Sequence, residues 1–138
     1  SVLHVTPFRS FPSGVTASAS KRWQYLHWAE AREGFLIEDD FSSEFSLSSK
    51  SEDTLFSLAQ QQRVIYLNTF SKTIAPSLRI GYMVLPENLL LPFQQRLGFY
   101  SCTVPTFEQY VLADLLNSGD FERHINRIRR KKRQQKEE

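Results

Sequence analysis

The sequence has few of the residues that disulfide-stabilised proteins, metal sites and membrane spans require. Its one cysteine, Cys102, excludes an internal disulfide and suits a reducing compartment. Its three histidines lack the spacing of metal ligands, so we predict no metal site. No apolar run approaches the ~20 residues of a membrane helix, and no signal peptide is recognisable. We therefore expect a cytoplasmic protein that makes no membrane contact.

The composition is that of a globular protein. The chain has 138 residues, of which 41% are hydrophobic and 13% aromatic, enough for one compact unit with a core. The formal net charge is only +2, yet basic residues crowd positions 127 to 136. Such a run on a helix is typical of a solvent-exposed face. An alternative interpretation is a small basic protein that binds nucleic acid through its C-terminal helix.

Short apolar runs alternate with segments of helical periodicity. Strands are expected at residues 3–6, 35–37, 64–67 and 79–85, with a brief one at 45–47. Helices are expected at residues 21–32, 87–97, 106–117 and 121–135. Alternating strands and helices, followed by helices alone, predict an α/β layered domain.

The segment between the strands at 64–67 and 79–85 concentrates groups that suit a phosphorylated aldehyde. Thr69 and Ser71 place two hydroxyls before Lys72, and Arg79 follows seven residues later. A lysine amine forms an imine with an aldehyde, whereas hydroxyls and the planar fork of an arginine bind phosphate. Taken residue by residue, a polar turn with an exposed lysine explains the same segment.

Residues 68–82 taken together indicate a function more specifically than the single residues do. Residues 68–82 resemble the lysine segment of fold-type-I proteins that bind pyridoxal 5'-phosphate (PLP), the aminotransferase class I and II group. The resemblance implies part of the large domain of that fold, with a mostly parallel sheet flanked by helices. It also implies that Lys72 is the catalytic residue that carries PLP, and that Thr69, Ser71, Lys72 and Arg79 bind the cofactor.

A second segment, residues 35–45, contains the run Glu38, Asp39, Asp40 and Phe41. It is similar to the PLP-binding domain of MocR/GabR-type transcriptional regulators of the GntR family, and residues 5–16 and 119–125 extend the similarity. The resemblance implies that Asp39 pairs with the pyridine nitrogen of PLP and that Phe41 lies at the cofactor. Phe41 stands where the group usually has tyrosine, and Arg9 stands where it usually has histidine.

The resemblance also implies what the chain lacks. We expect residues 1–138 to be a fragment of the PLP-binding large domain that ends in a helix toward a missing small domain. The intact regulator would be a homodimer that senses an amino acid or amine and contacts DNA only through a missing N-terminal domain. A fragment of a catalytic PLP-dependent aminotransferase acting on amino acids is the alternative of the same fold.

Overall fold

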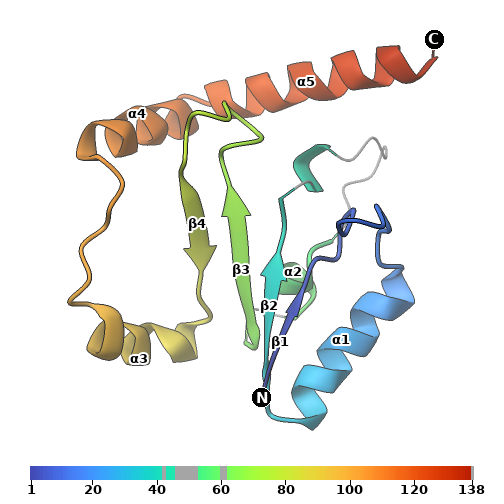
Figure 1. The fold of residues 1–138 in the computed structure, drawn as a ribbon, viewed down its shortest axis with the longest axis vertical. Helices are drawn as coiled ribbons and strands as arrows, with labels where there is room; N and C mark the ends of the chain where they lie inside the picture. The colour runs from blue at the N-terminus through green and yellow to red at the C-terminus, as the bar shows by residue number, and fades with distance from the viewer. Residues whose placement is uncertain (42, 46–52, 60–61, 138) are drawn as a thin grey trace.

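The computed structural model describes residues 1–41, 43–45, 53–59 and 62–137. Its centre is a four-stranded sheet in the order β1–β2–β3–β4 (Figure 1). The strands are β1 (Val2–Val5), β2 (Phe35–Asp39), β3 (Val64–Thr69) and β4 (Gly81–Val84). β1, β2 and β3 are parallel, whereas β4 runs antiparallel to β3. The carboxyl ends of the three parallel strands therefore lie at one edge of the sheet.

Helices α1 (Ala19–Ala31) and α2 (Leu55–Leu58) complete the core on one side of this sheet. The Ser18 side chain begins α1 by accepting a hydrogen bond from the Lys21 amide, as expected of an N-cap. The buried cluster consists of Ala29, Leu36, Leu55 and Val64. Burial of these side chains from α1, β2, α2 and β3 ties the two helices to the parallel strands.

Three further helices follow β4: α3 (Glu87–Leu97), α4 (Thr106–Asn117) and α5 (Asp120–Glu137). Neither α3 nor α4 buries a residue. The last helix, α5, lies across the carboxyl end of the sheet (Figure 1). His124 Nε2 of α5 lies 2.9 Å from the carbonyl oxygen of Thr73, which follows β3, so the two segments are in direct contact.

The expected elements are found, with differences at a few boundaries. The strands expected at 3–6 and 35–37 are β1 and β2, and β2 extends to Asp39, so its carboxylates belong to the strand. Leu47 of the expected strand at 45–47 lies outside the described residues, and Ser43–Phe45 form a turn of 3-10 helix, η1. The four-residue helix α2 was not expected, because one turn is too short to show periodicity. None of the helices among the described residues has the length and apolarity needed to cross a membrane.

Candidate functional site

The carboxyl ends of β2 and β3 bring the two segments with chemical groups to the same edge of the sheet. Asp39 pairs with Leu67 in the parallel register, and the Asp40 amide donates to the Leu67 carbonyl at 2.9 Å. Thr69, two residues beyond Leu67, ends β3. The acidic run at the end of β2 and the lysine segment after β3 are therefore neighbours, although more than thirty positions separate Asp39 from Lys72 along the chain.

A cluster of two hydroxyls and a guanidinium lies at the carboxyl end of β3. The Thr69 and Ser71 hydroxyl oxygens are 3.1 Å apart, and the Ser71 amide donates to Thr69 Oγ1 at 3.2 Å. Arg79 Nη1 donates to Ser71 Oγ at 3.3 Å. The Arg79 side chain is exposed, so its remaining N–H donors are open to an anion. Three of the residues expected to bind the cofactor are thus in contact with one another.

Lys72 and Phe41 form a second contact of the same site. The Lys72 Nζ lies 3.9 Å from the centroid of the Phe41 ring, within the range of a cation–π interaction. Phe41 is half-buried and Lys72 is exposed, so the amine packs on one ring face while its other sides meet solvent. This contact links the residues directly after β2 to the lysine segment after β3.

Asp39 lies at the same edge but stands apart from the lysine cluster. Its carboxylate is half-buried, and Oδ2 lies 3.5 Å from His4 Nε2 on β1. Among the described residues, no hydrogen bond or ion pair joins Asp39 to Lys72 or to Arg79. The structure therefore brings Thr69, Ser71 and Arg79 together and Phe41 to Lys72, while Asp39 faces β1.

A buried polar network beneath the site was not anticipated from the sequence. Asp40 accepts the Ser43 amide at 2.9 Å, the Ser43 hydroxyl, and the Tyr66 hydroxyl at 2.8 Å. Asn68 Nδ2 donates to Glu44 Oε1 at 2.6 Å and to the Tyr66 hydroxyl oxygen at 2.8 Å. The network fixes η1 against β3, which positions the backbone around Phe41.

Burial raises the pKa values of two acidic groups in this network, Tyr66 and Glu44, and so favours their neutral forms. Burial, and then the negative charge of Asp40, raises the pKa of Tyr66 far above its usual range, so the phenol stays protonated and donates to Asp40. Burial likewise raises the pKa of Glu44, with the charge of Asp40 acting in the same direction. Both shifts favour the protonated form of the group concerned.

Comparisons with known proteins agree on one family. The sequence pattern of aminotransferase class I and II matches residues 2–138. The uncharacterized HTH-type transcriptional regulator YdeL of Bacillus subtilis is 41% identical over 135 residues, which are 96% of this chain and 29% of that protein. The probable rhizopine catabolism regulatory protein MocR of Rhizobium meliloti is 33% identical over 129 residues, 94% of this chain and 26% of its own length.

A solved structure agrees with the sequence relatives. Kynurenine aminotransferase of Pyrococcus horikoshii, solved in complex with PMP and kynurenine, superposes with a TM-score of 0.81 at 33% identity. The match covers 94% of this chain and 32% of that enzyme. The chain thus spans about three-tenths of the length of the proteins it matches.

Proposed function

Because the chain belongs to the aminotransferase class I and II family, we propose that it is the portion of a MocR-type transcriptional regulator that binds PLP through Lys72. The observation that carries the proposal is the cluster of Thr69, Ser71 and Arg79 directly beside Lys72. Domain organisation follows from the same proposal: residues 1–138 are a fragment of the large domain of an intact protein.

The donor set fits a phosphorylated aldehyde. The exposed guanidinium of Arg79 and the hydroxyls of Thr69 and Ser71 supply donors for phosphate oxygens, the arginine bidentately. Lys72 follows Ser71 directly in the chain and is exposed, so its amine is accessible for a covalent bond to the aldehyde carbon. When bound, PLP supplies an electron sink for the α-carbon of an amino acid.

Asp39 and Phe41 have secondary roles in this proposal. Asp39 at the end of β2 holds the proton on the pyridine nitrogen, which requires its carboxylate to face the ring as well as His4. Phe41 packs beside the Lys72 amine and, without a hydroxyl, donates no hydrogen bond to the cofactor. In this proposal both residues bind and orient the cofactor.

Borohydride reduction of the full-length protein with PLP, followed by peptide mapping, tests the central assignment. The pyridoxyl group is expected on the peptide that contains Lys72, and Lys72→Ala should abolish the label. Lys131→Ala, on the exposed side of α5, is the matched control and should retain it. Label on another lysine in the wild-type protein would overturn the assignment.

The regulator and the enzyme are distinguished by two measurements on the full-length protein. Similarity to two transcriptional regulators supports a helix-turn-helix domain that binds DNA, with this chain sensing an amino acid or amine as part of a homodimer. Similarity to kynurenine aminotransferase supports the enzyme. DNA binding that changes with an amino acid supports the regulator, whereas multiple turnovers with an amino acid and a 2-oxo acid, without DNA binding, support the enzyme.

A further inference from the structure

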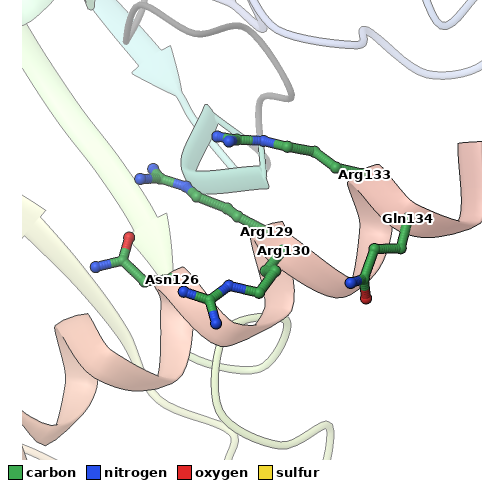
Figure 2. Close-up of a pocket in the computed structure, with 5 residues that line it drawn as sticks. All are labelled: Asn126, Arg129, Arg130, Arg133 and Gln134. Atoms are coloured by element: carbon green, nitrogen blue, oxygen red, sulfur yellow. The ribbon is translucent and has the colours of Figure 1, made fainter. Parts of the chain in front are cut away.

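A hollow of about 420 Å³ lies along helix α5, and we call it the α5 hollow. The described residues that line it are Asn126, Arg129, Arg130, Arg133 and Gln134. Figure 2 shows Arg129 and Arg133 extending side by side toward η1. The volume is within the range of small-molecule sites. None of the residues expected to bind PLP is among those that line the hollow, so it is a separate place on the molecule.

One arginine of the α5 hollow is held in place by the rest of the fold. Arg129 Nε donates a hydrogen bond to the carbonyl oxygen of Glu44 in η1, and the Arg129 side chain is half-buried. A guanidinium has five N–H donors, so this bond leaves the donors of its two terminal nitrogens for a ligand. A side chain that is already held loses less conformational entropy when it binds an anion, which favours binding.

The positive charge of the α5 hollow is not matched by carboxylates. From residue 123 to residue 136, α5 contains no acidic residue. Among the described residues, no ion pair joins Arg129, Arg130 or Arg133 to a carboxylate. Glu44 contacts Arg129 through its backbone carbonyl, whereas its carboxylate accepts a hydrogen bond from Asn68. Three guanidinium groups around one hollow repel one another, and an anion bound among them offsets that repulsion.

We propose that Arg129, Arg130 and Arg133 bind a small ligand with two linked phosphate groups, such as a nucleoside diphosphate. The planar fork of an arginine binds phosphate oxygens bidentately. A phosphate group carries about −1.5 to −2 charges at neutral pH, so a single phosphate leaves part of the charge of three arginines unmatched, and a second phosphate compensates it. The amides of Asn126 and Gln134 supply donors and acceptors for the rest of the ligand.

The position of the α5 hollow favours a small ligand over the backbone of a nucleic acid. A nucleic acid is bound by basic residues spread over an exposed face. Arg127 and Lys131 belong to the exposed face of α5, and neither lines the hollow. Arg129, in contrast, is half-buried where α5 contacts η1. The site goes beyond the proposed function, because its ligand is bound away from Lys72 and without the cofactor.

The test compares inorganic pyrophosphate with inorganic phosphate by isothermal titration calorimetry. The full-length protein is first loaded with PLP and freed of excess, so that the phosphate donors near Lys72 are occupied. Pyrophosphate should bind the wild-type protein at least tenfold more tightly than phosphate. Arg130→Gln and Arg133→Gln change exposed side chains and should each weaken pyrophosphate binding by roughly ten- to a hundredfold, the value of a charge-assisted hydrogen bond.

Arg127→Gln is the matched control, because it removes the same charge from α5 outside the hollow, and it should bind pyrophosphate as the wild-type protein does. Equal binding of pyrophosphate and phosphate would overturn the proposal, as would unchanged pyrophosphate binding in Arg130→Gln and Arg133→Gln. A short DNA duplex of unrelated sequence is titrated in the same way. Tight duplex binding that Arg127→Gln weakens as much as Arg130→Gln would also overturn the proposal, because the whole basic face of α5 would then bind nucleic acid.

Discussion

The two halves of the molecule differ in how their apolar residues are covered. In the half formed by β1, β2, β3, α1 and α2, Leu36, Leu55 and Val64 are fully buried. In α3 and α4 no residue is buried, and Leu91, Phe107 and Tyr110 are exposed by 61%, 76% and 73%. A large exposed apolar surface of this kind marks a contact with another part of a protein or with a partner. The first half has its own core, and the second supports the proposal that the chain is part of a larger domain.

The comparison is tested most strongly by truncating leucines in both halves. Leu36→Ala should lower the free energy of unfolding by about 2–5 kcal/mol, because it removes a fully buried side chain and leaves a cavity. Leu91→Ala is the matched control in α3 and should change the free energy of unfolding by less than about 0.5 kcal/mol. Chemical denaturation followed by circular dichroism measures both, and equal effects would contradict the difference between the halves.

A polar side chain also belongs to the core of the first half. The fully buried Glu38 accepts the Leu55 amide at 2.8 Å and the Phe56 amide at 2.9 Å, so it holds the beginning of α2. Glu38→Ala should lower the free energy of unfolding by about 1–3 kcal/mol, since it leaves the buried Leu55 amide without an acceptor. Glu30→Ala, on the exposed face of α1, is the control. A loss no greater than that of the control would show that the two hydrogen bonds contribute little.

Local patterns in the sequence predicted much of the fold. The expected ranges 87–97 and 106–117 coincide with α3 and α4, because proline precedes each helix and a glycine follows within two residues of its end. The antiparallel direction of β4 was not predicted, since a short apolar run reads alike in both directions. The exposure of α3 and α4 does not follow from the sequence of the two helices themselves, because their apolar residues have the composition of core helices, yet none of these residues is buried.

The candidate site was predictable only where its residues are close in sequence. Thr69, Ser71 and Arg79 lie within eleven positions, and their contact follows from one loop. The bonds from Tyr66 to Asp40 and from Asn68 to Glu44 span 26 and 24 positions, so they depend on the strand register. The roles of Lys72, Thr69, Ser71, Arg79, Asp39 and Phe41 toward PLP stay predictions.

The buried network makes the stability of the first half depend on pH through Glu44. Burial, and then Asp40, raises the pKa of Glu44 in the folded protein above its ordinary value of 4.5. The folded state therefore binds this proton more tightly than the unfolded state, and the stability it contributes is full below pH 4.5 and lost as pH rises through the raised folded pKa. Glu44 Oε2 is also buried without a hydrogen-bond partner among the described residues.

Glu44→Gln should remove this dependence. Its carbonyl oxygen can still accept from Asn68, and the side chain no longer ionises. The variant should therefore gain stability relative to the wild-type protein as pH rises above 4.5, by less than about 1 kcal/mol because solvent screens this partly exposed group. Unfolding curves at several pH values measure the difference, with Glu33→Gln, on the surface, as control. A difference that is constant with pH would mean that Glu44 titrates normally.

The smallest change in stability is expected from charges placed on the second half. Leu91 and Phe107 are exposed in α3 and α4, so Leu91→Lys with Phe107→Lys should alter the unfolding free energy by less than about 0.5 kcal/mol. The same change should markedly reduce self-association of the isolated chain, because it interrupts the apolar surface with like charges. Sedimentation velocity at several concentrations measures this, and Asn88→Lys with Glu108→Lys adds lysines to the same helices without removing an apolar side chain. Association that persists in the first variant would place the contact elsewhere on the chain. Marked destabilisation of that variant would mean that α3 and α4 are covered in solution, and the contrast between the two halves would then fail.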